Sequence, residues 1–157
     1  MEQCMIGRKN FQSSDRSLLM KLKTKYEGLF LNTNMKEYKQ KGNDCLRTCI
    51  ACLIEVEPEE IVDFKELFFA GEFNGVPKWH IELEKWLNER GLTRRLATKE
   101  EIESNEPLIA IGLAADTGVM HAEIYSNGKL LYDPSGMNKK LLDVQAYQKI
   151  DKYERAE

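Results

Sequence analysis

The spacing of apolar residues changes once along this chain, and this change limits the folds that the chain can adopt. In the first part, apolar residues recur at helical spacing, as do Trp79, Leu83 and Trp86. In the last part, apolar and alternating segments surround a strong turn signal at Asn127 and Gly128. Helices followed by strands predict an α+β fold, with N-terminal helices packed on a small antiparallel β-sheet. Helices are expected to begin near residues 43, 58 and 77, and a buried strand is expected over 107–113.

Length and charge exclude several classes of protein. A chain of 157 residues with 42% hydrophobic content can bury one core, and its formal net charge of -3 produces no field that favours nucleic acid. No apolar run of about 18 residues is present to span a membrane, and the first residues lack the apolar stretch of a signal peptide. We therefore expect a cytoplasmic protein with neither a nucleic-acid nor a membrane partner.

The charge distribution separates residues 1–34 from the rest of the chain. This segment carries six basic and three acidic side chains, whereas the remainder has an acidic excess. Within it, residues 13–15 can cap a helix on which Leu18, Leu22 and Tyr26 share a face. We predict an N-terminal extension with a short helix over 1–34 and a single domain over 35–157. The helix could pack on the flank of the domain or bind a partner.

Three of the four cysteines lie within eight residues, which is not the spacing of a secreted disulfide framework. Cys45 follows Asn43 and Asp44, both good N-caps, and is therefore expected in the first turn of a helix. Unpaired N–H groups and the helix dipole stabilise an anion there. The thiolate is the nucleophilic form of cysteine, so Cys45 is the candidate nucleophile, with a small buried apolar residue as the alternative. We expect Cys49 and Cys52 to be core residues.

A cysteine nucleophile needs a base, and the chain has two histidines. His80 lies beside Glu82 and Glu84, off the apolar stripe of its helix, and is expected to face solvent. His121 begins an alternating strand, and Asp133 closes the returning strand of the hairpin. His121 is therefore the candidate base.

The register of the hairpin decides whether Asp133 can orient His121. A three-residue loop over 126–128 would pair His121 with Asp133 and gather the apolar residues on the other face. A two-residue Asn-Gly turn would instead put Asp133 beneath Ala122 and mix the faces. We prefer the three-residue loop, in which Asp133 can act as the third member of a Cys/His/acid triad. Residues 133–136 also have the composition of a plain turn, and the two roles are compatible.

These residues together resemble the papain-like cysteine peptidase superfamily. The resemblance consists of Gln40 before Cys45 at a helix start, His121 opening a strand, and Asp133 between Tyr132 and Pro134 after a hairpin. The most similar branch is that of the bacteriocin-processing (double-glycine) peptidases and their small phage and bacterial relatives. The resemblance covers about residues 39–136.

The resemblance implies a papain-like fold and a cysteine hydrolase, most simply a peptidase, that acts on a peptide or protein substrate without a cofactor. It implies Cys45 as nucleophile, His121 as general base and then acid, and Asp133 as the orienting residue. Gln40, on the incoming loop, would direct its amide N–H at an oxyanion formed near the sulfur, and the backbone N–H of Cys45 could be the second donor.

Other functions remain open. The cysteines at 45, 49 and 52 have the spacing that binds a 4Fe-4S cluster in radical SAM enzymes, but that motif needs an extended loop and a βα barrel, and this segment reads as helix. A zinc site lacks a second pair of ligands. A catalytically inactive papain-like module could bind a protein partner. A deamidase or transglutaminase-like acyl transferase would use the same three residues as a peptidase.

Overall fold

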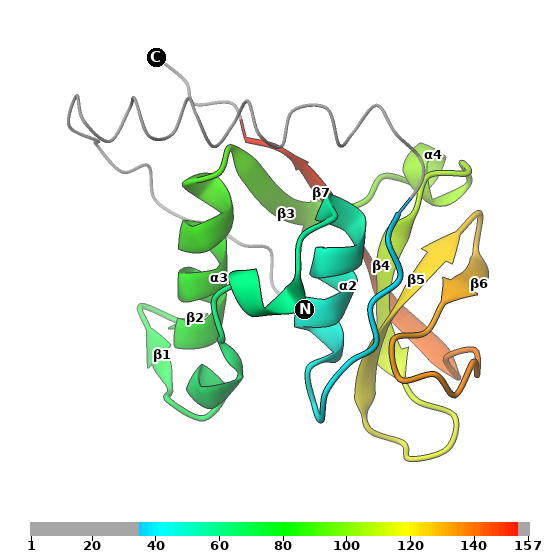
Figure 1. Cartoon of the computed structure of the whole chain (residues 1–157), viewed down its shortest axis with the longest axis horizontal. Coiled ribbons are helices and arrows are strands. Elements are labelled where there is room, and N and C mark those ends of the chain that lie inside the picture. The colour runs from blue at the N-terminus through cyan, green and yellow to red at the C-terminus, as the bar shows by residue number, and fades with distance from the viewer. Residues whose placement is uncertain (1–34, 154–157) are drawn as a thin grey trace.

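Most helical residues of this protein precede its large sheet, as the sequence predicts (Figure 1). The computed structural model describes residues 35–153, so the predicted extension over 1–34 and its short helix lie outside the described residues, as do residues 154–157. The helical elements are α2 (Cys45–Ile54), η2 (Pro58–Glu60), η3 (Lys65–Leu67), α3 (Lys78–Asn88) and α4 (Lys99–Ile102). The strands are β1 (Glu72–Phe73), β2 (Val76–Pro77), β3 (Leu92–Leu96), β4 (Leu108–Leu113), β5 (Met120–Ser126), β6 (Lys129–Tyr132) and β7 (Asp143–Lys152). The predicted α+β class is confirmed.

The large sheet has five strands in the order β3-β7-β4-β5-β6, and every neighbouring pair is antiparallel. The last strand, β7, lies between β3 and β4, so the C-terminal segment completes the sheet. The strands β3 and β7 and the separate β1–β2 hairpin were not predicted from the sequence. The predicted buried strand over 107–113 is confirmed as β4. This strand separates the charged edge at β3 and β7 from the β5–β6 hairpin.

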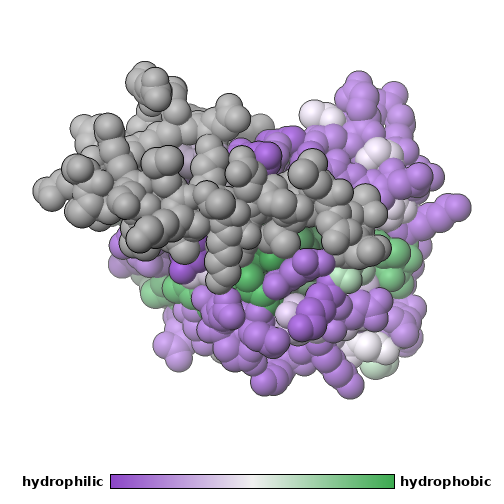
Figure 2. All heavy atoms as spheres, turned by 45° about the horizontal axis from the view of Figure 1, so that its top comes forward, coloured by the Kyte–Doolittle hydropathy of each residue, from purple (hydrophilic) through white to green (hydrophobic). Residues whose placement is uncertain are grey.

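Charged side chains connect α4 to β3 and β7. Arg95 on β3 binds Glu101 at 2.7 Å and Asp151 at 2.8 Å. Lys149 on β7 binds Glu101 at 2.8 Å and Glu106 at 2.7 Å. In Figure 2 the coloured part of the surface is mostly hydrophilic, with a smaller band of hydrophobic residues across it. The network holds this end of the sheet together.

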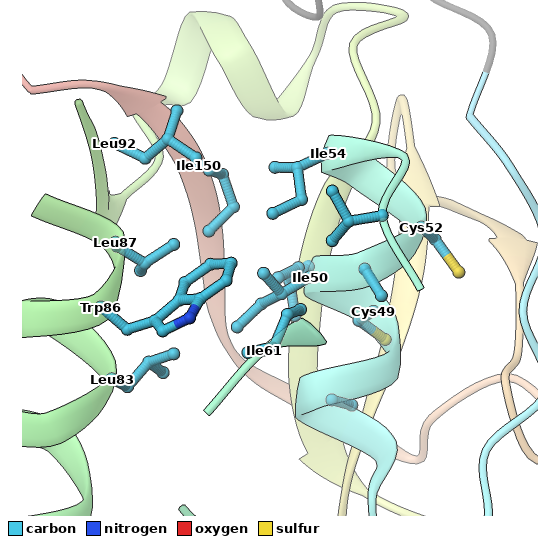
Figure 3. Packing of buried hydrophobic residues seen from close by; sticks show 14 of the residues in the cluster. Cys49, Ile50, Cys52, Ile54, Ile61, Leu83, Trp86, Leu87, Leu92 and Ile150 are labelled. Carbon is cyan, nitrogen blue, oxygen red and sulfur yellow. The ribbon is translucent and has the colours of Figure 1, made fainter. Parts of the chain in front are cut away.

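The core lies between the sheet and the two longer helices, α2 and α3. Figure 3 shows Ile50 and Ile54 of α2 directed toward Leu87 of α3, whereas Cys52 points away from α3. Cys49 and Cys52 are both 0% exposed, which confirms their assignment to the core. Burial raises the pKa of the Cys49 thiol well above its ordinary value and that of Cys52 to about 11. Both thiols are therefore protonated at neutral pH.

The prediction of a three-residue loop in the β5–β6 hairpin is wrong. The turn has two residues, Asn127 and Gly128, with φ of 52° and 71°. Positive φ at both positions is the requirement of a type I′ turn, which matches the twist of the strands. The paired residues are Ser126 with Lys129, Tyr125 with Leu130, and Ile124 with Tyr132.

A bulge in β6 corrects the register that this short turn would impose. Between Tyr125 and Ile124 the partner strand advances by two residues, so Leu131 is the extra residue. Without the bulge, Asp133 would lie beneath Ala122, on the side of β5 that packs against the helices. Because of the extra residue, Asp133 lies instead on the face of the sheet that also carries His121 and Glu123.

The expectation that His80 faces solvent is also wrong, because this side chain is 7% exposed. Arg94 of β3 donates from Nη2 to His80 Nδ1 at 2.8 Å and from Nη1 to Gln148 at 3.0 Å. Since a guanidinium only donates, His80 Nδ1 must be the acceptor. Burial and the Arg94 charge lower the pKa of His80 to about 4. The acidic neighbour Glu84 is buried as well and lies 3.6 Å from Arg94 Nε.

We predict that Gly112→Ala destabilises the protein strongly. Gly112 lies where β4 changes register against β7, and a Cβ atom there would collide with the backbone carbonyl of Asp143. The strands would have to separate, at a cost of about 3 kcal/mol. Gly118→Ala is the control, because nothing lies within 4 Å of its Cβ position and only its φ of 67° opposes substitution. That strain costs about 1 kcal/mol. Equal losses in denaturant unfolding would contradict the close approach.

Candidate active site

Cys45 is the first residue of α2 and is half-buried. Asp44 occupies the N-cap position but makes no side-chain cap hydrogen bond. Its carboxylate instead accepts from Arg47 at 3.3 Å, and Arg47 also donates to the Ile61 carbonyl at 3.0 Å. The Asp44 carboxylate is thus balanced by a cation and leaves the first-turn N–H groups uncapped. Stabilisation of a Cys45 thiolate by this helix start stays a prediction.

His121 links Cys45 to Asp133. Its imidazole is close enough to the Cys45 thiol for the two groups to interact electrostatically, and its Nε2 lies 2.9 Å from Asp133 Oδ1. The contact at Nε2 leaves Nδ1 as the nitrogen that can exchange a proton with the sulfur. Burial opposes protonation of His121, but the hydrogen bonds and charges of Cys45 and Asp133 raise its pKa to about 9. At neutral pH the imidazole is therefore a cation.

The turn after β6 holds Asp133 in place. Asp133 Oδ1 accepts from the Ser135 N–H at 2.9 Å and from the Ser135 hydroxyl at 2.8 Å, and Oδ2 accepts from the Asn138 N–H at 3.1 Å. Burial of this carboxyl group favours its neutral form, but His121 and these donors lower its pKa. The Gly136 N–H also donates to the Asp133 carbonyl at 3.0 Å, which confirms the predicted turn. The residues that form the turn therefore also supply the hydrogen bonds that orient the Asp133 carboxylate.

Gln40 lies beside this network. Its backbone N–H donates to the Pro134 carbonyl at 2.9 Å, which connects the loop before α2 to the turn after β6. Its side-chain Nε2 donates to the Gly42 carbonyl at 2.7 Å, a bond that uses one of the two N–H groups on that nitrogen. Gln40 lines the same groove as Cys45. Its role as an oxyanion donor stays a prediction, and the second N–H is the group that could serve.

Glu123 is a second buried carboxyl group beside His121, and the sequence analysis overlooked it. It is 1% exposed, its Oε2 lies 3.9 Å from His121 Nε2, and the ligand atoms of Glu123, His121 and Asp133 lie within 4.8 Å of one another. Tyr125 donates its hydroxyl to Glu123 Oε1 at 3.3 Å. Burial and the Asp133 charge raise the pKa of Glu123 to about 7. The alternation of β5 was the available signal, because it places Glu123 on the same side of the strand as His121 and Tyr125.

A groove of about 570 Å³ opens beside Cys45 and His121. Part of its lining is an aromatic cluster of Phe64, Phe68 and Trp79, whose ring centroids lie 5.4 to 5.8 Å apart. Val119, in the loop between β4 and β5, and Met120, the first residue of β5, also line it, and both are exposed apolar residues. A substrate that reaches the thiol therefore meets a mainly apolar surface.

His121, Glu123 and Asp133 are also close enough to bind a metal ion, with ligand atoms within 4.8 Å of one another. Their hydrogen bonds are not those of a metal site, because both Asp133 oxygens already accept hydrogen bonds, from the His121 imidazole and from the following turn. The cysteines of α2 do not converge: the helix is continuous, and the Cys52 sulfur accepts from the Tyr38 N–H at 3.3 Å. This geometry is unfavourable for a 4Fe-4S cluster.

No protein-family model, curated protein or solved structure matches this chain. The resemblance to papain-like peptidases therefore remains a hypothesis that depends on the site residues themselves. Among residues 35–153, no helix combines the length and the apolar character that crossing a bilayer requires.

We predict that the two histidines titrate far apart, with His121 near pH 9 and His80 near pH 4. The raised pKa of His121 means that its charge stabilises the folded protein fully below pH 6.5, and that this stabilisation is lost as pH rises through about 9. NMR of the imidazole Cε1–H signals measures both values. Cys45→Ser should lower the pKa of His121 by about one unit or more, because it removes a hydrogen-bonded anion.

The signal of His80 is the internal control, because its pKa depends on burial and Arg94 rather than on Cys45. It should not move in the Cys45→Ser variant. If both histidines of the unmodified protein titrate near the ordinary value of 6.5, the proposed interaction of His121 with Cys45 and Asp133 is wrong.

Proposed function

We propose that this protein is a papain-like cysteine hydrolase that cleaves peptide bonds in a peptide or protein substrate. The observation that carries the proposal is the placement of Cys45, His121 and Asp133 in the lining of one groove, with Cys45 at a helix start and His121 Nε2 2.9 Å from Asp133. These three residues come from α2, β5 and the turn after β6. Core packing alone does not require a cationic imidazole beside a half-exposed thiol, whereas nucleophilic catalysis does.

The proposed reaction proceeds through a thioester on Cys45. The thiolate attacks the carbonyl carbon of the scissile amide, and the resulting oxyanion accepts hydrogen bonds from the Cys45 backbone N–H and the Gln40 side chain. His121 donates a proton to the leaving amine as the C–N bond breaks. The neutral imidazole then takes a proton from water, whose oxygen attacks the thioester and releases the acid product. The thiolate and the imidazolium are thereby restored, with Asp133 holding the ring.

The lining of the groove supports a substrate with a bulky apolar side chain near the scissile bond. Phe68 is 42% exposed, although it is in contact with Trp79 and with the nearly buried Phe64. An apolar side chain placed against these rings would be removed from water, which contributes roughly 1.5 to 3 kcal/mol for a fully buried residue. Gly or Ala at the same substrate position would gain much less. We therefore propose preference for large apolar side chains.

We predict that iodoacetamide at pH 7 labels Cys45 faster than Cys4, Cys49 or Cys52. The reason is that Cys45 combines a helix start with a cationic partner, whereas Cys49 and Cys52 are fully buried. Mass spectrometry after partial labelling measures the four rates, with glutathione as the reference thiol. His121→Asn should slow labelling of Cys45 by about tenfold or more, because it removes the cation that stabilises the thiolate. Equal labelling at all four cysteines would remove the nucleophile from the proposal.

We also predict cleavage of a random-sequence peptide library, detected as new termini by mass spectrometry, with large apolar residues enriched beside the cut. Phe68→Ala should raise KM by about tenfold, because it removes an exposed ring of the groove. Phe73→Ala is the matched control, since Phe73 is 64% exposed on β1 and does not line the groove. Its KM should stay as in the unmodified protein.

The same experiment separates the alternatives. Conversion of glutamine to glutamate without chain cleavage would identify a deamidase, and amine adducts would identify an acyl transferase. Retention of uncut apolar peptides by both the unmodified protein and Cys45→Ala would identify a binding module. Each of these results would replace the peptidase reading.

A further inference from the structure

Two carboxyl groups, Glu123 and Asp133, meet at a single imidazole in this site, and one negative charge is enough to orient it. We propose that Glu123 is a positioning residue, which keeps its proton while the site is active and donates it to Asp133. Asp133 alone then faces His121 as a carboxylate. The catalytic meaning of this inference rests on the proposed hydrolase function, whereas the shared proton does not.

The hydrogen-bond donors around the two acids decide which of them carries the charge. Asp133 accepts from His121 Nε2, from the N–H and hydroxyl of Ser135, and from the Asn138 N–H. Glu123 accepts one hydrogen bond, from the Tyr125 hydroxyl at 3.3 Å. The oxygen of that hydroxyl in turn accepts a hydrogen bond from the backbone N–H of Leu141 at 2.8 Å. A carboxylate is stabilised by each donor directed at it. The charge therefore belongs on Asp133 and the proton on Glu123.

The groups that face Glu123 from each neighbouring element favour its neutral form. On β4 its cross-strand partner is Ala110, which carries no charge. The titratable groups of α2 in the same region are Cys45, which lines the groove together with Glu123, and Cys49, a fully buried thiol. The cation near Glu123 is His121, at 3.9 Å, and the imidazole is closer to Asp133, at 2.9 Å. Two carboxylates beside one cation would leave one negative charge without a close partner.

The protonation of Glu123 is poised to change within the ordinary pH range. Burial and the charge of Asp133 raise the pKa of Glu123 to about 7, while His121 and Tyr125 act in the opposite direction. Above this pH the donated proton is lost, and the two carboxylates repel each other. The added charge also holds the proton on His121 more firmly, which makes the imidazole a weaker acid toward the leaving amine. Hydrolysis should therefore decline above about pH 7, well below the titration of His121 itself near 9.

The first test is a pH titration of the His121 Cε1–H signal by NMR. The unmodified protein should show two inflections, one near pH 7 from Glu123 and one near pH 9 from the imidazole. Glu123→Gln should abolish the lower inflection, because the amide can donate to Asp133 at every pH and cannot ionise. Glu72→Gln is the matched control: Glu72 is exposed on β1, and this change should leave both inflections.

The second test compares two replacements of similar size. Glu123→Gln retains a donor to Asp133, whereas Glu123→Leu cannot donate. At pH 6, alkylation of Cys45 by iodoacetamide should be about tenfold faster in Glu123→Gln than in Glu123→Leu, the rate equivalent of one lost hydrogen bond. A purely structural carboxyl would give equal rates in the two variants. If Glu123→Leu does not fold, as judged by circular dichroism, the NMR titration of Glu123→Gln decides alone.

A single inflection in the unmodified protein, or a lower inflection that persists in Glu123→Gln, overturns the inference. Failure of the proposed function gives a different result. If no peptide is cleaved but the lower inflection is present and depends on Glu123, the shared proton is supported and the hydrolase is not. If peptides are cleaved and the lower inflection is absent, the hydrolase stands and Glu123 has no positioning role.

Discussion

The rest of this structure depends on the burial of α2 among apolar side chains. Six of its ten residues are buried, so it needs apolar partners on several sides. The sheet and α3 provide most of these, and the segment that contains Tyr38 meets the Cys52 sulfur. Each buried Ile or Leu side chain contributes roughly 1.5 to 3 kcal/mol, so movement of the helix along its axis would cost several such contributions. The core, rather than the site, therefore fixes the position of Cys45.

The features that the sequence predicts well depend on residues that are neighbours in the chain. Asn43 and Asp44 signal a helix start, and the helix does begin at Cys45. Asn127 and Gly128 signal a turn because both adopt positive φ readily, and the structure has a turn there. The contact between the His121 and Asp133 side chains was also anticipated, since only a hairpin separates them, although the register from which it was predicted is wrong. Cap and turn preferences act over a few residues, so one sequence is enough to read them.

The features that the sequence does not predict depend on contacts between distant segments. His80 looks like a surface residue, and only Arg94 on the neighbouring strand makes its burial possible. Glu123 belongs to the site because the turn after β6 brings Asp133 against it. The strand β7 has charged and amide side chains along its length, and its inner position depends on β3 and β4, which flank it. Local spacing places Glu123 on the side of His121, but it identifies neither Arg94 as the partner of His80 nor the strands that flank β7.

The bulge at Leu131 has a consequence beyond the hairpin. The strand β6 ends the strand order of the sheet and has four residues. A regular edge strand presents a continuous row of unpaired N–H and C=O groups, to which a strand of another molecule can add. The bulge interrupts that row at a residue that is 50% exposed. The irregularity that returns Asp133 to the side of His121 thus also hinders fibril-like growth from this edge, so solubility and site geometry depend on the same residue.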